Sequence, residues 1–559
     1  MTTLSDILIK SRQDIPDQVA IYLQHAGHED FSITYEGLFR NAAGYSRVFE
    51  SQGIQPGEVV VLILQHGKEL IFSFFGAILH GAVPSIMPFL TEKLSPERYR
   101  ADMAALIGVT RPAGIVTYPE FEEEVRAALE EGDSVRRVIL AEEIDPVDIR
   151  DANMLSGLRR EEDDIVLLQH SSGTTGLQKG VALSHQAILN QLNAYGQALH
   201  LSEEDVLVSW LPLYHDMGLI AGFLLPVLKR IPLVLMSPFD WVRAPYRLMQ
   251  SVSQYRGTLS WLPNFAYNFC AQRVRERDME DVDLSSWRMI VNCSEPVRWE
   301  SHEAFYEKFK KYGLEKSALH TSYAMAENVF GVTQSDPRGA PVVEIIDREA
   351  FLVDQVARPA DDDLPGLKLM SSGRVISNTQ IRVVNEARQG LPDGEIGEII
   401  LKSDCMLSGY YNRPGITGKA FFDGWYLTGD YGYLSNGELF VTGRKKDMLI
   451  VGGKNVYPQD IEEIAYEVDG VHKGRAVVFG IFDERSGTED VVLVAEADLK
   501  DDAERQKISD ALRQHVTKNA AIALRYVRVV GPKWILKSSS GKTARLANKE
   551  KYLKEVFEK

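Results

Sequence analysis

The sequence predicts an α/β protein with a large N-terminal domain and a smaller C-terminal domain. Short apolar runs that suit buried strands alternate with longer amphipathic runs that suit helices, and this alternation is typical of layered α/β folds with largely parallel sheets. The 559 residues are enough for one large domain and one small domain, each with its own core. Closely spaced turns from Gly390 onward indicate a separate β-rich part.

The individual elements of the N-terminal part follow from this alternation. No repeat with a period of about 20–50 residues is visible, which argues against solenoids and propellers. The predicted strands are Val59–Gln65, Ile165–His170, Val206–Leu211 and Leu233–Met236. The predicted helices are Tyr35–Ser51, His185–Ala198 and Trp299–Tyr312.

The chain is expected to divide near residue 444, within Gly443–Met448. Residues 1–444 are predicted to form an N-terminal domain of layered α/β subdomains, which includes a small β-barrel-like subdomain at about 375–442. Residues 445–559 are predicted to form a mobile α+β lid. The elements expected in this lid are helices at Pro458–Val468 and Asp502–Lys518 and strands at Ala476–Phe479 and Val491–Ala495.

Composition and charge exclude several classes of protein. The net charge of −17 argues against general nucleic-acid binding and against an anionic membrane surface. Charges interrupt the N-terminal region where a signal peptide needs an apolar run, and the most apolar segment, Leu219–Met236, contains two prolines and two basic residues. The cysteines Cys270, Cys293 and Cys405 are odd in number and lack metal-ligand spacing. We therefore expect a cytoplasmic protein with buried thiols, no nucleic-acid partner and no membrane insertion.

Ser171–Gly180 (SSGTTGLQKG) has the composition of an anion-binding loop. It follows a predicted strand and is expected to lead into the helix that begins near His185. Its glycines permit tight turns that direct backbone N–H groups at an anion, while two threonine hydroxyls and Lys179 add donors and positive charge. Because Gln178 stands where a Walker A loop requires glycine, the loop is not of that type. It predicts phosphate binding, and the alternative is a flexible polar loop.

Four further segments carry polar groups suited to chemistry, although each alone is as often structural as functional. Ser538–Arg545 (SSSGKTAR) is a second Gly/Ser loop with a lysine, and Leu211–Leu219 (LPLYHDMGL) contains a His-Asp pair. Tyr323–Glu327 (YAMAE) offers an aromatic plane and a carboxylate suited to Mg²⁺. Tyr426–Asp430 (YLTGD) ends in a carboxylate that suits ribose hydroxyls.

Taken together and in this order, these segments resemble the adenylate-forming superfamily of acyl- and aryl-CoA synthetases, luciferases and peptide-synthetase adenylation domains. The resemblance covers nearly the whole chain. Leu262–Tyr267 (LPNFAY), Asn292–Pro296 (NCSEP) and Glu438–Asp460 are most similar to fatty acyl-AMP ligases. The resemblance implies activation of a carboxylic acid, favouring a medium- or long-chain fatty acid, by ATP and Mg²⁺ to acyl-AMP with release of pyrophosphate. Transfer to the phosphopantetheine of an acyl carrier protein would follow.

The resemblance also assigns roles to matching positions. It implies catalytic roles for Lys179, for Lys542 near the attacking carboxylate, and for His215 as a gate beside that carboxylate. It places Thr174 and Glu327 on the magnesium side, and it makes Lys446 the hinge. The implied ATP/AMP-binding residues are Ser171, Ser172, Gly173, Thr174, Thr175, Gly176, Lys179, Asn292, Cys293, Ser294, Glu295, Pro296, Tyr323, Ala324, Asp430, Arg444 and Lys542.

The acyl acceptor is predicted from the long connection between Glu327 and Gly373. Its segment Pro341–Ser371 resembles the insertion by which fatty acyl-AMP ligases impede the lid and favour a carrier protein over CoA. The alternatives are a surface embellishment in an acyl-CoA or aryl-CoA ligase and, as a different class, a non-catalytic module that binds nucleotide or acyl-adenylate. Apolar residues around Trp261–Phe269 and Ile220–Leu225 suit an alkyl tunnel or an ordinary core equally well.

Overall fold

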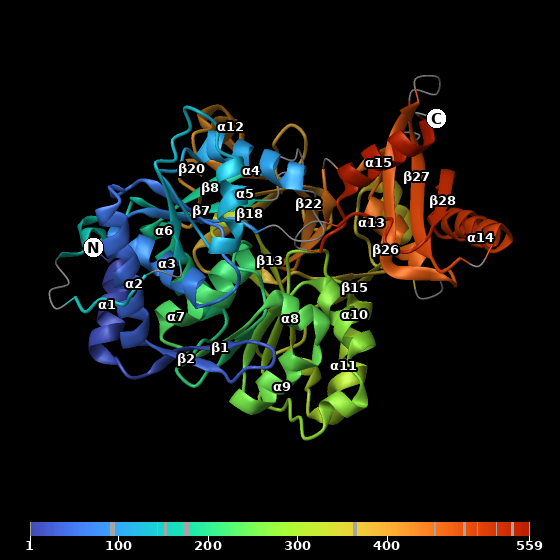
Figure 1. The fold of residues 1–559 in the computed structure, drawn as a ribbon. Coiled ribbons are helices and arrows are strands. Elements are labelled where there is room, and N and C mark those ends of the chain that lie inside the picture. Colours follow the sequence, from blue (N-terminus) through green and yellow to red (C-terminus); the bar gives the residue numbers. More distant parts are fainter. Residues whose placement is uncertain are drawn as a thin grey trace. The chain divides into compact units, whose positions relative to one another are not determined.

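The computed structural model of the chain is shown in Figure 1. It describes residues 2–89, 96–141, 144–149, 154–171, 179–361, 366–445, 447–451, 454–483, 488–499, 501–520, 522–537 and 541–557. By their contacts these residues form two compact units. The first is Met1–Val342, Ser372–Gln380 and Leu401–Tyr426, and the second is Val343–Ser371, Ile381–Ile400 and Leu427–Lys559. The domain boundary expected near residue 444 stays a prediction.

The first unit contains parallel sheets, which confirms the predicted α/β class. Strands β4, β3, β5 and β6 form one parallel sheet, and β1, β10, β9, β11, β12 and β13 pair in parallel in another. The strands that lie in this unit are β1 (Val19–Gln24), β2 (Phe31–Thr34), β3 (Val59–Leu62), β4 (Val83–Ile86), β5 (Gly114–Thr117), β6 (Arg137–Leu140), β7 (Ile165–Ser171), β8 (Lys179–Ser184), β9 (Leu207–Ser209), β10 (Leu233–Met236), β11 (Leu259–Leu262), β12 (Met289–Asn292), β13 (Leu319–Ala324), β14 (Gly331–Gln334), β17 (Arg374–Val375), β20 (Gly409–Tyr410) and β21 (Phe421–Phe422).

Helices accompany these sheets, and α1, α2 and α3 pack against one another (Figure 1). Helix α2 begins where the Thr34 hydroxyl accepts the backbone N–H of Gly37 (3.1 Å), and α3 ends at Gly81 in the left-handed conformation (φ 82°). The helices of the unit are α1 (Leu4–Asp14), α2 (Tyr35–Ser51), α3 (Lys68–His80), α4 (Pro96–Thr110), α5 (Glu122–Ala127), α6 (His185–Ala198), α7 (Leu225–Lys229), α8 (Pro238–Arg243), α9 (Tyr246–Tyr255), α10 (Asn264–Arg273), α11 (Trp299–Phe309) and α12 (Pro414–Lys419).

The second unit combines antiparallel hairpins with helices. Strands β26 and β27 pair antiparallel, β28 joins β27 in parallel, and apolar side chains of these strands pack with those of α13 and α14 in one core. Its elements are β15 (Val343–Ile346), β16 (Leu367–Met370), β23 (Glu438–Arg444), β24 (Leu449–Val451), β25 (Lys454–Val456), α13 (Pro458–Tyr466), β26 (Val471–Asp483), β27 (Thr488–Ala497), α14 (Asp502–Ala520), β28 (Leu524–Val530) and α15 (Arg545–Phe557). Three strands include residues of both units: β18 (Thr379–Val384), β19 (Gly397–Ser403) and β22 (Trp425–Ser435).

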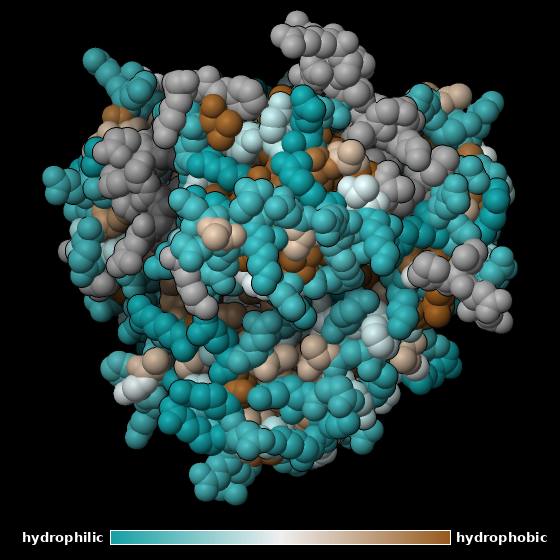
Figure 2. All heavy atoms as spheres, turned by 90° about the vertical axis from the view of Figure 1, so that its right-hand side faces the viewer, coloured by the Kyte–Doolittle hydropathy of each residue, from teal (hydrophilic) through white to brown (hydrophobic). Residues whose placement is uncertain are grey.

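The strands of the β-rich part pair in open arrangements, and no closed barrel is found among the described residues. Antiparallel pairing of β22 with β23 gives the long hairpin expected for a turn-rich segment. Cys270, Cys293 and Cys405 are buried, as predicted. The described residues include no helix that is both long and apolar enough to cross a membrane. The face seen in Figure 2 is largely hydrophilic, with apolar side chains scattered across it.

Candidate active site

The predicted phosphate loop lies between two paired strands, so a strand that was not predicted separates it from the helix predicted near His185. Strands β7 and β8 are antiparallel, and their register places Ser171 opposite Lys179. Residues Lys179–Ser184 form β8, which runs back along β7. Helix α6 begins directly after β8, where the Ser184 hydroxyl accepts the N–H of Ala187 (3.1 Å). The predicted residues Ser172, Gly173, Thr174, Thr175 and Gly176 lie outside the described residues.

Lys179 and Glu327, which are far apart in the sequence, both contact Tyr410 within the first unit. The Lys179 Nζ atom lies 4.7 Å from the centre of the Tyr410 ring. The Tyr410 hydroxyl donates to Glu327 Oε1 (2.9 Å) and lies 2.9 Å from the hydroxyl of Tyr426. Tyr410 therefore joins a cation that suits phosphate to a carboxylate that suits a metal ion.

Glu327 fits a magnesium site that is completed by substrate. Among the described residues, no group of three or more His, Cys, Asp or Glu side chains could hold a metal ion. Mg²⁺ in nucleotide sites is commonly held by one or two carboxylates together with substrate phosphates, rather than by a cage of protein ligands. The half-buried carboxylate of Glu327 meets that requirement.

The segments at Asn292 and Tyr323 leave neighbouring parallel strands. Strands β12 and β13 pair with Asn292 opposite Thr321, so the residues that follow them emerge at the same edge of the sheet. Tyr323 is buried, and its N–H donates to the Thr333 hydroxyl (3.1 Å). Ala324 lies at the end of β13 and is half-buried. The shared edge is where α/β proteins place ligands.

Several side chains of the Asn292–Pro296 segment contact other residues of the protein. Asn292 is fully buried, and its Nδ2 donates to Asn264 Oδ1 (2.9 Å). The Glu295 carboxylate accepts the N–H of Phe265 (3.0 Å) in the first turn of α10. Ser294 has a left-handed backbone (φ 68°), and Cys293 Sγ lies 3.1 Å from Met217 Sδ. The segment can therefore present backbone to a ligand while Asn292 and Glu295 hold its shape.

His215 lies in the turn before the π-helix Met217–Leu224. Its Nδ1 is 3.9 Å from Asp216 Oδ1, and that oxygen accepts the N–H of Met217 (2.7 Å) at the start of the helix. The carboxylate of Asp216 is thus engaged by the helix N-terminus, and the His215 ring retains partial exposure.

Asp430 and Arg444 are brought together in the second unit. The β22–β23 register places them opposite each other, with Arg444 Nε 3.1 Å from Asp430 Oδ1. Asp430 is buried, and its N–H donates to the Thr428 hydroxyl (3.0 Å). A cavity of about 260 Å³ lies beside this pair and is lined by Thr428, Gly429, Arg444 and Lys445. The predicted hinge residue Lys446 lies outside the described residues.

Lys542 is half-buried in the segment that precedes α15 of the second unit. The neighbouring backbone is anchored on both sides, because Lys537 and Thr543 form an isolated β-bridge and the Ala544 N–H donates to the Leu536 carbonyl (3.0 Å). Arg545 then pairs with Glu462 of α13. The side chain of Lys542 therefore projects from a backbone that is held in place.

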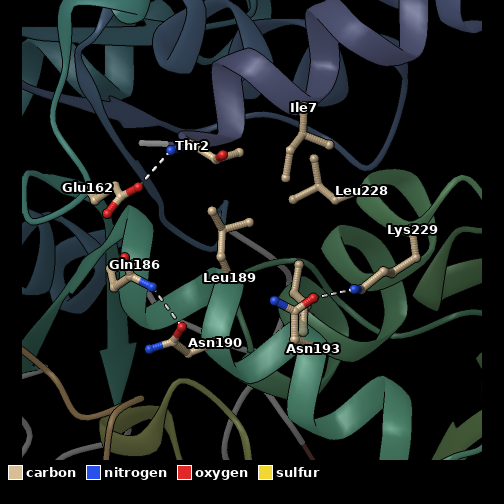
Figure 3. Close-up of a pocket in the computed structure, with 10 residues that line it drawn as sticks. Thr2, Ile7, Glu162, Gln186, Leu189, Asn190, Asn193, Leu228 and Lys229 are labelled. Atoms are coloured by element: carbon tan, nitrogen blue, oxygen red, sulfur yellow. Dashed lines mark hydrogen bonds between the residues drawn. The ribbon is translucent and has the colours of Figure 1, made fainter. Parts of the chain in front are cut away.

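A second cavity, of about 300 Å³, contains none of the predicted site residues (Figure 3). Its polar groups pair with one another: Gln186 Nε2 donates to Asn190 Oδ1 (2.7 Å), and Lys229 Nζ donates to Asn193 Oδ1 (2.5 Å). We assign it no role in the chemistry. Its lining residues are Thr2, Ile7, Glu162, Gln186, Leu189, Asn190, Leu192, Asn193, Leu228 and Lys229.

Sequence reasoning missed Tyr410 and Lys445. Tyr410 belongs to a run, Ser408–Pro414 (SGYYNRP), whose glycine and tyrosines read as a turn between strands. Only the pairing of β20 with β8 brings it beside Lys179, and no local pattern encodes that pairing. Lys445 lines the cavity beside Arg444, and its Nζ lies 3.5 Å from Glu398 Oε2. The basic run Arg444–Lys446 was the available signal.

Comparison with known proteins places these residues in a family context. Residues 10–411 match the family described as AMP-binding enzyme. A 4-hydroxyphenylalkanoate adenylyltransferase of Mycobacterium tuberculosis is 30% identical over 100% of this chain and 92% of its own. A medium-chain fatty acid–[acyl-carrier-protein] ligase of Moorena producens is 29% identical over 99% of this chain and 95% of its own. A solved structure from a study of fatty acyl-adenylate ligases of E. coli and L. pneumophila has a TM-score of 0.90 and 28% identity, covering 100% of this chain and 98% of that one.

Proposed function

The chain belongs to the AMP-binding enzyme family, and we propose that it activates a fatty acid with ATP and passes the acyl group to the phosphopantetheine thiol of an acyl carrier protein. It is an acyl-adenylate-forming enzyme. The similarity to a fatty acid–[acyl-carrier-protein] ligase over nearly the whole chain supports both the acid and the acceptor. A cytoplasmic location stays a prediction from the sequence.

The observation that carries the proposed site is the meeting of Lys179 and Glu327 at Tyr410. Adenylation requires a carboxylate oxygen to form a bond to the α-phosphorus of ATP while the bond from that phosphorus to pyrophosphate breaks. Two anions must therefore approach, and at about 4 Å with an effective dielectric constant of about 20 their repulsion is roughly 4 kcal/mol per pair of unit charges. Positive charge held at the phosphates offsets this repulsion.

Each proposed residue has a part in this chemistry. Lys179 binds the phosphates that leave as pyrophosphate, and Lys542 stabilises the charge at the carboxylate and α-phosphate. Glu327 would hold Mg²⁺, which supplies charge neutralisation at the phosphate oxygens when it is bound. Asp430 accepts hydrogen bonds from the ribose hydroxyls, with Arg444 beside it. Tyr323 stacks on the adenine base.

The acid class is tested by the release of pyrophosphate with a panel of acids. We expect turnover with alkyl acids of medium or long chain and a kcat/KM at least about tenfold lower with 4-hydroxyphenyl alkanoates, because an extra or missing methylene alone changes binding by roughly 1–3 kcal/mol. A kcat/KM that is highest for aryl acids would contradict the fatty-acid assignment. If the protein binds ATP but releases no pyrophosphate with any acid, the proposed enzymatic activity is contradicted.

We further propose that the insertion predicted at Pro341–Ser371 restrains the C-terminal segments and so disfavours CoA. Within the second unit, the Phe351 ring lies 6.4 Å from that of Tyr457, in one apolar cluster with residues of β22 and β23. Arg348 donates to the carbonyl of Asn519 in α14. These contacts tie the insertion to residues on the C-terminal side of the predicted hinge.

Replacing Arg348 with alanine is expected to raise the rate of acyl-CoA formation several-fold, because it removes one contact between the insertion and α14. The measurement is acyl-CoA formed from ATP, fatty acid and CoA. Arg358→Ala is the matched control, since Arg358 lies on the same insertion but pairs with Asp354 (3.5 Å) at the surface. Equal rates of acyl-CoA formation in the two variants would contradict the proposal that the insertion restrains the C-terminal segments.

A further inference from the structure

Tyr410 lies in a segment that forms backbone hydrogen bonds with both the Lys179 segment and the Glu327 segment of the candidate site. Strand β20 pairs with β8, the strand that begins at Lys179, and places Tyr410 opposite Val181. The next residue, Tyr411, donates its N–H to the Gly180 carbonyl (2.8 Å). On the other side, the N–H of Leu407 donates to the backbone carbonyl of Glu327 (2.9 Å).

The side chain of Tyr410 also connects these two segments, because it contacts both the Lys179 ammonium and the Glu327 carboxylate. Its ring lies 4.7 Å from Lys179 Nζ, and its hydroxyl lies 2.9 Å from Glu327 Oε1. A lysine over the face of a tyrosine ring is attracted by the ring electrons. A carboxylate that accepts from a buried hydroxyl is held in one orientation. One side chain thus restrains both the cation and the carboxylate.

The direction of the hydroxyl hydrogen bond follows from the surroundings. The Tyr410 hydroxyl lies 2.9 Å from Glu327 Oε1, and beside a carboxylate a phenol is the donor because the carboxylate oxygens accept. The phenol proton is donated to the carboxylate. The hydroxyl of Tyr426 lies 2.9 Å from that of Tyr410, and it donates there because the single proton of Tyr410 is used in the bond to Glu327. The chain of donors ends on Glu327.

We propose that Tyr410 is a positioning residue that sets Lys179 and Glu327 in register for the nucleotide phosphates and their metal ion. This inference rests on the phosphate and metal roles proposed above for these two residues. Partners that orient a metal-ligating carboxylate are worth about 10–100-fold in metal affinity where they have been removed. The ring and the hydroxyl of Tyr410 have separable tasks, because the ring faces Lys179 and the hydroxyl faces Glu327.

Two variants separate these tasks. Tyr410→Phe keeps the ring under Lys179 and removes the hydroxyl, whereas Tyr410→Leu removes both. Mn²⁺ affinity is measured by electron paramagnetic resonance on the full chain with a non-hydrolysable ATP analogue and no acid. We expect Tyr410→Phe to weaken Mn²⁺ binding roughly tenfold with little change in analogue affinity at saturating Mn²⁺. Tyr410→Leu is expected to weaken the analogue itself by a further factor of roughly three.

Tyr411→Phe is the matched control, because it removes a hydroxyl from the adjacent residue, and it is expected to leave both affinities at wild-type values. The unfolding temperature of each free protein is recorded as well. A role confined to stability would lower that temperature without changing the Mn²⁺ affinity of the folded protein, and this outcome would overturn the inference. Equal Mn²⁺ affinities for Tyr410→Phe and Tyr411→Phe would overturn it too.

A third variant distinguishes this inference from the proposed site. If Glu327→Gln weakens Mn²⁺ binding and Tyr410→Phe does not, the positioning role is wrong and the metal role of Glu327 stands. If Glu327→Gln also binds Mn²⁺ with wild-type affinity, then the metal role itself fails, and the positioning role fails with it.

Discussion

Lys542→Ala is expected to lower kcat for adenylation by about 10²–10³-fold and to leave the unfolding temperature nearly unchanged. The proposed task of Lys542 is to stabilise charge that develops in the transition state, and removing a single donor with such a task costs about that factor. Folding should survive because the neighbouring backbone is held by the Ala544–Leu536 hydrogen bond and by the pairing of Arg545 with Glu462. The measurement is pyrophosphate release at saturating ATP and acid, together with thermal unfolding.

The control for this variant is Lys549→Ala, which removes a half-buried lysine from α15 and changes the net charge equally. We expect Lys549→Ala to turn over at close to the wild-type rate, because Lys549 has no proposed role in the chemistry. Wild-type turnover in Lys542→Ala would show that the catalytic lysine has been placed wrongly.

Asp430→Ala is expected to raise KM for ATP by roughly 10–100-fold, the factor that corresponds to the loss of hydrogen bonds to a charged group. Asp430 is buried beside the cavity of about 260 Å³, where a ribose could reach it. Its ion pair with Arg444 should add little to stability, because the Arg444 side chain is 52% exposed to solvent. The unfolding temperature should therefore change far less than KM.

Steady-state kinetics with varied ATP test this prediction, with Asp430→Asn and Asp469→Ala measured alongside. The asparagine keeps the shape of the side chain and should give an intermediate KM. Asp469 is exposed in the second unit, so its replacement controls for net charge and should leave KM unchanged. A wild-type KM for ATP in the Asp430→Ala variant would contradict the proposal that Asp430 binds the nucleotide.

Elements with strong local signals were predicted correctly from the sequence. Helices α2 and α6 have the predicted bounds, because Thr34 and Ser184 cap amphipathic runs at the point where the apolar spacing begins. Strand β10 also has the predicted bounds, whereas β3 and β9 are shorter than their apolar runs. Helix α11 ends at Phe309 and is followed by a 3₁₀ turn to Tyr312.

Elements that depend on distant partners were missed or predicted too short. Strand β8 was absorbed into the predicted loop–helix junction, since six residues carry little signal until β7 and β20 pair with them. Strand β20 consists of Gly409 and Tyr410 alone, and such pairing is settled by tertiary context. Strand β26 runs from Val471 to Asp483, well beyond the predicted Ala476–Phe479, because antiparallel pairing with β27 continues past the apolar core.

The candidate site likewise contains residues that the sequence predicts and a residue that it does not predict. The residue types and the order of Lys179, Glu327, Asp430 and Lys542 were readable from the sequence because they lie in compact motifs. The Asp430–Arg444 pair was expected to share a task, and the β22–β23 register shows them opposite each other. The Tyr410 bridge was not readable, since its three partners are distant in the sequence and its own segment resembles an ordinary turn.

The most direct test of the central claim is the identification of products by mass spectrometry after the full chain is mixed with ATP, Mg²⁺ and a medium-chain fatty acid. The account predicts acyl-AMP and pyrophosphate in equal amounts, with the acyl group passing to a carrier-protein thiol when one is added. Formation of ADP and inorganic phosphate instead, or no cleavage of ATP in the presence of the acid, would contradict it.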